Sequence, residues 1–235
     1  MSTSISKINH VGLIMDGNRR WARARKYPIW KGYKEGARTA RTVIEYLYKK
    51  NILYVSVYAL SLENLDRSAT EITELFRLIA QVSEQEIDWL VHAGIKVVFV
   101  GDWSRYPEKI RRTCEKIQQK TMLGQKMVLS ILFFYGGQQE IVAATKLYLQ
   151  AVQAGTENPE QLTPAIFARY LWTSPIPPPD IIIRTGDRAR LSNFLLFQAA
   201  YAHCYWSSVL WPDLTPDIVE NYIITAENTG QSYGT

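Results

Sequence analysis

The stretch GLIMDGNRRWARAR (residues 12–25) joins an apolar run to a strongly basic segment. The apolar run favours a buried strand that ends at Met15. A single carboxylate, Asp16, follows, Gly17 permits a tight turn, and the arginines begin a helix. This order of strand, turn and helix predicts the first unit of an α/β fold, with Asp16 at the carboxyl end of its strand.

Apolar runs of strand length recur along the chain and alternate with amphipathic segments of helix length. The expected strands are 10–15, 53–59, 96–100, 128–134, 179–186 and 205–212, and the expected helices are 36–50, 68–92, 106–123, 138–154 and 163–170. This alternation predicts one α/β domain over residues 1–235, with a mostly parallel six-stranded sheet and helices on both faces. The carboxyl ends of the strands are then the expected ligand-binding edge.

The composition is that of a globular protein with a basic surface. The chain has 235 residues, a net charge of +5 and a pI near 9.1, which suits phosphorylated substrates, nucleic acid or anionic lipid. No segment is apolar enough to span a bilayer and residues 1–9 lack the pattern of a secretory signal, so we expect a cytoplasmic protein with at most peripheral membrane contact. Cys114 and Cys204 have no ligand-like spacing and are expected to be free thiols.

Two separated basic clusters suggest a pocket for a diphosphate. One lies between Arg19 and Lys34, and the second contains Arg184, Arg188 and Arg190. Arginine matches phosphate oxygens with a planar fork. In the second cluster, Ser192 and Asn193 would add hydrogen-bond donors, and a helix that starts near Ser192 would add its backbone N–H groups. An exposed basic turn is the alternative interpretation of that cluster.

Asp16 among arginines is explained by a metal. A diphosphate requires both cationic side chains and a divalent cation, and aspartate is an ordinary ligand of Mg²⁺. Asp16 would hold the ion while Asn18, Arg19 and Arg20 grip phosphate oxygens. A helix N-cap is the alternative role for Asp16. The sequence lacks the GxxxxGK[ST] and GxGxxG motifs, so the phosphates are not expected to be those of ATP or a dinucleotide.

Four segments resemble the successive signatures of the cis-prenyltransferases, the family of undecaprenyl and other Z-polyprenyl diphosphate synthases. They are HVGLIMDGNRRWA, YALSLENLDR, FYGGQQEIV and DIIIRTGDRARLSNFLLFQAAYAHCYWSSVLWPD, in order between residues 10 and 213. The resemblance implies a homodimeric enzyme with an apolar tunnel, which joins isopentenyl diphosphate to an allylic diphosphate with the help of Mg²⁺.

The same resemblance assigns roles by position. Asp16 matches the metal-binding aspartate, and Asn64 matches a residue proposed to take part in proton removal, with Ser61 beside it in the loop. The residues that match substrate-binding positions are Gly17, Asn18, Arg19, Arg20, Trp21, Glu63, Arg67, Arg184, Arg190 and Ser192. His203 stands where the family has a second metal-linked carboxylate, so we expect it near the ion, or else bonded to a neighbour near a dimer interface.

Several departures from the family pattern surround the allylic side. Ile29 and Tyr33 replace the arginine and histidine of RxxGH, and Phe134 replaces the asparagine before Tyr-Gly-Gly. Phe134, together with Leu132 and Phe133, predicts a shortened tunnel and a short or irregular product. The alternative is that these three side chains point away from the tunnel and belong only to the core. Two other functions remain open: a non-catalytic partner subunit, which the retained Asp16 disfavours, and a nucleic-acid-binding protein using Trp21, Tyr27 and Trp30.

Overall fold

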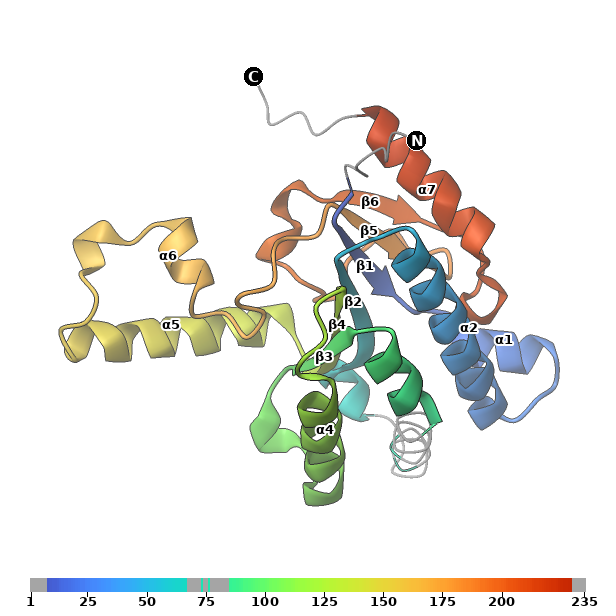
Figure 1. Cartoon of the computed structure of the whole chain (residues 1–235), viewed down its shortest axis with the longest axis horizontal. Helices are drawn as coiled ribbons and strands as arrows, with labels where there is room; N and C mark the ends of the chain where they lie inside the picture. Colours follow the sequence, from blue (N-terminus) through green and yellow to red (C-terminus); the bar gives the residue numbers. More distant parts are fainter. Residues whose placement is uncertain (1–7, 67–72, 74–75, 77–84, 230–235) are drawn as a thin grey trace.

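The computed structural model describes residues 8–66, 73, 76 and 85–229 (Figure 1). Within these residues six parallel strands form one sheet in the order β3-β4-β2-β1-β5-β6. The strands are β1 (His10–Ile14), β2 (Tyr54–Ser61), β3 (Ile95–Val100), β4 (Met127–Tyr135), β5 (Ile181–Arg184) and β6 (His203–Trp206). The predicted α/β sheet is confirmed.

Helices connect the strands as the sequence pattern indicates. They are α1 (Asn18–Ala24), α2 (Ile29–Lys49), α4 (Glu108–Thr121), α5 (Gly137–Gln153), α6 (Pro164–Ala168) and α7 (Pro216–Thr229). Of the helix expected at 68–92, residues 85–92 are helical and most of the remainder lies outside the described residues. The sequence pattern did not indicate α7, although Pro216 at its first position is a typical helix start.

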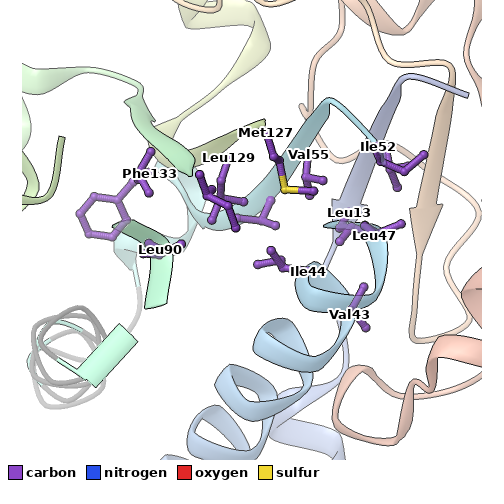
Figure 2. Close-up of a cluster of buried hydrophobic side chains, with 14 of the residues drawn as sticks. Leu13, Val43, Ile44, Leu47, Ile52, Val55, Leu90, Met127, Leu129 and Phe133 are labelled. Atoms are coloured by element: carbon purple, nitrogen blue, oxygen red, sulfur yellow. The ribbon is translucent and has the colours of Figure 1, made fainter. Parts of the chain in front are cut away.

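One face of the sheet carries the larger core. Figure 2 shows Val43, Ile44 and Leu47 of α2 in the same cluster as Leu13 of β1 and Val55 of β2. Positions 43, 44 and 47 lie on one face of α2, and that face packs on the sheet. Buried residues of α4, α7 and the helical segment 85–92 extend this cluster.

The opposite face is covered differently from the sequence expectation. Alternate strand residues such as Ile182 and Leu132 pack there against Phe194, Leu195 and Ala199, which lie in turns and a short 3-10 helix. Helix α5 instead extends away from the body of the molecule, with α6 beside it (Figure 1). Irregular chain, rather than a long helix, therefore supplies much of the second layer.

The sixth strand is shifted from its expected position. β6 spans His203–Trp206 rather than 205–212, because the chain after Trp206 bonds to the loop that follows β5. Gly186 and Asp187 donate their backbone N–H groups to the carbonyl oxygens of Val209 and Ser207, at 2.8 and 2.9 Å. The 207–210 segment thus fixes the loop that carries the second basic cluster.

Candidate active site

A cavity of about 1000 Å³ opens at the carboxyl ends of the central strands and continues between the sheet and α2. Its mouth is lined by charged and polar residues: Asp16, Asn18, Arg19, Arg20, Arg23, Ser61, Glu63, Asn64, Arg184, Arg190, Ser192 and Asn193. Its interior is lined mainly by apolar side chains: Ile44, Val57, Trp89, Leu90, Val97, Phe99, Ile117, Leu129, Ile131 and Phe133. Such a cavity suits a ligand with an anionic head and an apolar tail.

Asp16 lies between two arginines at the mouth. Its Oδ1 is 3.2 Å from Arg20 Nη2, and its Oδ2 is 3.0 Å from Arg184 Nη2. The Asp16 side chain keeps a third of its surface exposed, whereas that of Arg184 is 5% exposed. Gly17 is the N-cap residue of α1, so the alternative assignment of Asp16 as a helix N-cap is wrong.

Two glycines permit this close arrangement. Gly17 has φ of 122° and Gly186 has φ of 87°, a region that glycine adopts far more readily than other residues. A Cβ at Gly186 would lie 2.3 Å from Arg20 Nη2. Arg20 instead donates to the Gly186 carbonyl oxygen at 2.6 Å, so α1 and the loop after β5 share one wall of the mouth.

Arg184 organises the loop that follows its own strand. Its Nη1 donates to the Arg190 carbonyl oxygen at 2.5 Å and to Ser192 Oγ at 2.6 Å. Ser192 and Asn193 have φ of 49° and 66°, so the helix expected to start near Ser192 does not form. The predicted support from a helix N-terminus there is wrong, and the loop takes its shape from the Arg184 guanidinium.

Asn193 connects three loops at the cavity mouth. Its Nδ2 donates to Glu63 Oε1 at 2.6 Å and to Gln139 Oε1 at 3.1 Å. Its Oδ1 accepts the Gln138 N–H at 2.8 Å. Glu63 follows β2 and Gln138 lies at the start of α5, so one amide side chain fixes the segments that follow β2, β4 and β5. Sequence reasoning named Asn193 only as a donor beside Ser192 and did not foresee this role.

Comparison of the sequence with known proteins identifies the enzyme family of this chain. A family model described as "Putative undecaprenyl diphosphate synthase" matches residues 14–234. The chain is 36% identical to an isoprenyl transferase of Clostridium perfringens, across 96% of this chain and 89% of that protein. It is 34% identical to a farnesyl-diphosphate-specific undecaprenyl-diphosphate synthase of Xanthomonas axonopodis pv. citri, across 90% and 82%. The chain belongs to this prenyltransferase family.

Solved structures of cis-prenyltransferases share the fold. Lavandulyl diphosphate synthase from Lavandula x intermedia, in complex with dimethylallyl diphosphate, superposes with a TM-score of 0.94 at 27% identity, covering 98% of this chain and 99% of that one. A probable undecaprenyl diphosphate synthase from Campylobacter jejuni superposes with a TM-score of 0.81 at 26% identity, covering 98% and 100%. The prediction of a prenyl-group transferase is therefore confirmed.

Most of the predicted site residues lie together in this prenyltransferase. The predicted residues that line the cavity are Asp16, Gly17, Asn18, Arg19, Arg20, Ser61, Glu63, Asn64, Arg184, Arg190 and Ser192. Trp21 does not line it, because its indole N–H donates to Asp213 Oδ1 at 2.7 Å and its ring is buried. Arg67 lies outside the described residues.

His203 does not share a site with Asp16 within one chain. It is the first residue of β6 and pairs with Ile181, the first residue of β5, whereas the cavity mouth follows the other end of β5. Its N–H donates to the Asp180 carbonyl oxygen at 2.9 Å. The expected metal site formed by Asp16 and His203 of the same chain is therefore wrong, because the strand register separates them.

Arg41 of α2 and Glu86 of the 85–92 helix also line the cavity, and the sequence analysis did not predict either of them. Arg41 donates to Glu86 Oε2 at 2.7 Å and to Glu45 Oε2 at 2.8 Å, and its guanidinium lies 3.3 Å from the centroid of the Trp89 ring. These contacts tie the two helices together along the side of the cavity. The signal was present in the sequence, since Arg41 lies eight residues after Tyr33 and four after Ala37, on one face of a helix.

The structure also tests the expectations about the two cysteines and about membrane-spanning segments. Cys114 and Cys204 are free thiols, as predicted. Among the described residues, no helix is both long and apolar enough to cross a membrane.

Proposed function

We propose that this prenyltransferase condenses isopentenyl diphosphate with a short allylic diphosphate to give a short-chain or irregular prenyl diphosphate. The supporting observation is the cavity itself, which has arginines at its mouth and apolar side chains in its interior. The likeness to a structure that holds dimethylallyl diphosphate, with its higher TM-score, favours a five-carbon allylic substrate.

The two diphosphates would bind at different walls of the mouth. Arg19 and Arg20 at the start of α1 are proposed to hold the allylic diphosphate, and Arg184, Arg190 and Ser192 the isopentenyl diphosphate. Guanidinium groups in fixed positions stabilise the negative charge that develops as diphosphate leaves the allylic carbon. The apolar interior then excludes water from the allylic cation while the new carbon–carbon bond forms.

A proton must leave the condensed product to restore a double bond. Asn64 and Ser61 line the cavity next to the mouth, and the Asn64 N–H donates to Ser61 Oγ at 3.2 Å. This bond fixes the turn after β2 and so holds the Asn64 side chain near the reacting atoms. We assign Asn64 a role in proton removal, as the resemblance to the family implies.

Prenyltransferases of this family generally use a divalent metal, and Mg²⁺ fits the residues present here. Mg²⁺ is commonly held by one or two carboxylates, substrate phosphates and water. The Asp16 carboxylate, a third exposed at the mouth, supplies one such ligand beside the arginines that would hold the phosphates. Bound there, Mg²⁺ would neutralise charge on the allylic diphosphate and ease its departure.

Phe133 is the residue proposed to limit product length. It is fully buried, lines the cavity, and lies with Leu90 at the same end of the cluster in Figure 2. The rings of Tyr106 and Phe134 lie 5.2 and 4.7 Å from it, so it has little room to move aside. Leu132 packs on the opposite face of the sheet and Phe134 is not a cavity-lining residue, so neither is expected to block the chain.

The test is the product that purified protein forms from labelled isopentenyl diphosphate and a panel of allylic diphosphates. We expect products of about two to four isoprene units, because the Phe133 ring would close the cavity to a longer chain. Phe133→Leu should shift the mass spectrum towards longer products. Leu132→Val, which alters a buried residue away from the cavity, should leave it unchanged. Products of undecaprenyl length from the wild type, or the same spectrum from Phe133→Leu, would contradict the proposal.

We also propose that the active form is a homodimer located in the cytoplasm. Tyr201 and Trp206 are 69% and 38% exposed beside the open edge of the sheet at β6. Helix α5 extends from the body and exposes Val142 and Leu149. A second copy that covers these surfaces would bury them. Sedimentation velocity should give a dimer, and Trp206→Asp should shift it towards the monomer. A wild-type monomer at assay concentrations would contradict this part of the proposal.

A further inference from the structure

The connection between α1 and α2 exposes aromatic and basic side chains that the cavity does not use. Trp30 is 48% exposed and Tyr27 is 41% exposed. Residues 24–34 contain one arginine, three lysines and no acidic residue. We call residues 24–34 the α1–α2 corner. An exposed surface that combines large aromatic rings with unbalanced positive charge is typical of a binding surface.

The corner has a fixed shape. The Tyr27 N–H donates to the Ala22 carbonyl oxygen at 2.9 Å, and Lys26 has φ of 54°, so the chain reverses tightly after α1. Pro28 is the N-cap residue of α2 and sets the direction in which that helix leaves. Because Tyr27 lies on this short connection and Trp30 in the first turn of α2, little backbone entropy would be lost if they bound a partner.

Its charge is only partly balanced by neighbouring elements. Asp213 accepts from Arg25 Nη2 at 3.1 Å, and Glu35 accepts from Arg38 Nη1 at 3.1 Å. No ion pair is found for Lys26, Lys31 or Lys34 with the described residues. The corner therefore keeps a net positive charge that would attract an anionic surface.

The aromatic rings are better placed for insertion than for stacking on bases. Lys31 Nζ lies 3.4 Å from the Tyr27 ring centroid, and the Arg25 guanidinium lies 4.4 Å from the centroid of Trp21, which is itself buried. Base stacking needs an open ring face. Trp and Tyr with basic neighbours are instead the residues that favour the interface between lipid headgroups and hydrocarbon. This arrangement disfavours the nucleic-acid function considered from the sequence.

The corner also adjoins the cavity. Arg19, Arg20 and Arg23 of α1 line the mouth, and the chain passes from them directly into the corner. Figure 1 shows the α1–α2 connection on the far side of the molecule from α5, so contact with a surface here leaves the proposed dimer face open. An enzyme held by this corner would have its mouth close to that surface.

We propose that the α1–α2 corner binds anionic lipid surfaces, with Trp30 and Tyr27 entering the headgroup region and the lysines contacting lipid phosphates. Each basic residue near such a surface contributes a modest attraction that weakens with salt. Several of them together with two aromatic anchors would give reversible, peripheral binding. The enzyme would then handle amphiphilic prenyl diphosphates at the membrane surface.

The experiment measures co-sedimentation of the full-length protein with sucrose-loaded vesicles of phosphatidylcholine, with and without phosphatidylglycerol. The wild type should bind the anionic vesicles, and binding should weaken as salt rises. Tyr27→Ser with Trp30→Ser should reduce the partition coefficient by roughly tenfold or more, because both apolar anchors are lost. Lys26→Gln with Lys34→Gln should reduce it by about fivefold for each lysine.

The matched control is Met122→Ser with Leu123→Ser, two exposed apolar residues after α4. This pair should bind vesicles as the wild type does. Turnover of water-soluble substrates should be unchanged in the Tyr27/Trp30 variant, since neither residue lines the cavity. Circular dichroism would verify that each variant is folded.

A second readout locates Trp30 directly. Vesicles with lipids brominated close to the headgroup should quench part of the wild-type tryptophan fluorescence, and Trp30→Phe should lose that quenching while Trp206→Phe keeps it. The proposal is overturned if the wild type pellets with neither vesicle type, or if the Tyr27/Trp30 variant binds vesicles as the wild type does. A short RNA duplex, tested separately, should not bind, and binding of the duplex without binding of vesicles would also overturn the proposal.

Discussion

Replacing Arg190 with alanine should separate substrate binding from loop stability. The Arg190 side chain is exposed and lines the cavity, and only its backbone carbonyl oxygen accepts the bond from Arg184. Alanine keeps that carbonyl, so the free energy of unfolding should change by no more than about 0.5 kcal/mol. A lost charge-assisted contact to diphosphate is worth about 1.5–3 kcal/mol, so the KM for isopentenyl diphosphate should rise roughly 10- to 150-fold.

Arg184→Ala should instead affect both properties. Its buried guanidinium bonds to the Arg190 carbonyl, to Ser192 Oγ and to Asp16 Oδ2. Losing two neutral-acceptor bonds and one ion pair should lower the free energy of unfolding by on the order of 3 kcal/mol. The loop that carries Arg190 would also lose its support, so the KM should rise further than in Arg190→Ala.

The assay is steady-state turnover of labelled isopentenyl diphosphate at saturating allylic substrate, with the reverse titration alongside. Thermal unfolding by circular dichroism reports stability. Arg188→Ala is the matched control, because Arg188 is exposed in the same loop but does not line the cavity. Equal KM changes in Arg188→Ala and Arg190→Ala, or an equal rise for the allylic substrate, would refute the assignment of this loop to isopentenyl diphosphate.

Three further predictions concern the mouth and the core. Asp16→Asn should abolish turnover at every Mg²⁺ concentration while circular dichroism shows a folded protein, and retained turnover would exclude Asp16 as a metal ligand. His203→Glu should leave the half-saturating Mg²⁺ concentration unchanged, in contrast to the sequence expectation, and a lower value would show that His203 lies near the ion. Burial lowers the pKa of His10, so the unfolded state binds more protons and stability should fall as pH drops below about 6.5. Denaturant melts at several pH values should show that loss, and it should be smaller in His10→Gln.

The strand ends could be predicted because they depend on local signals. Apolar runs terminated by a polar residue or glycine locate the carboxyl ends of parallel strands, and these ends converge on one edge whatever the details of packing. Asp16, Ser61 and Arg184 were therefore brought together correctly from the sequence alone. The resemblance to a family added the roles of these residues, and the structure added the distances between them.

The start of α2 was missed because its glycines serve tertiary packing. The sequence analysis expects a helix that begins at Gly36, yet the helix begins at Ile29. A Cβ at Gly32 would lie 2.2 Å from the Asn18 carbonyl oxygen, and one at Gly36 would lie 2.1 Å from Asn18 Oδ1. These glycines allow α1 to approach α2, and a single sequence does not distinguish that use from a helix stop.

The misplacement of His203 has a related cause. Its position was taken from a family motif, and a motif fixes an order along the chain but not the end of a strand at which a side chain lies. His203 is the first residue of β6 and so lies at the amino end of the strand, where its backbone N–H donates to the Asp180 carbonyl oxygen. Which residues of 203–212 form the strand depends on the hydrogen bonds of Ser207 and Val209 to the loop after β5, and these long-range contacts leave no periodic signal in the sequence.

Asp16 explains how one edge of the sheet can accommodate both anions and a cation. Each of its carboxylate oxygens lies near a different arginine, Arg20 or Arg184, so Asp16 offsets part of the positive charge at the mouth. In the proposed function, a diphosphate would compete with Asp16 for the same N–H groups, and any N–H that turned to phosphate would leave a carboxylate oxygen open to a cation. Binding of the diphosphate and of the metal would then favour each other by the same factor. The arginines and the single aspartate after Met15 would therefore act together, the arginines on the diphosphate and Asp16 on the cation.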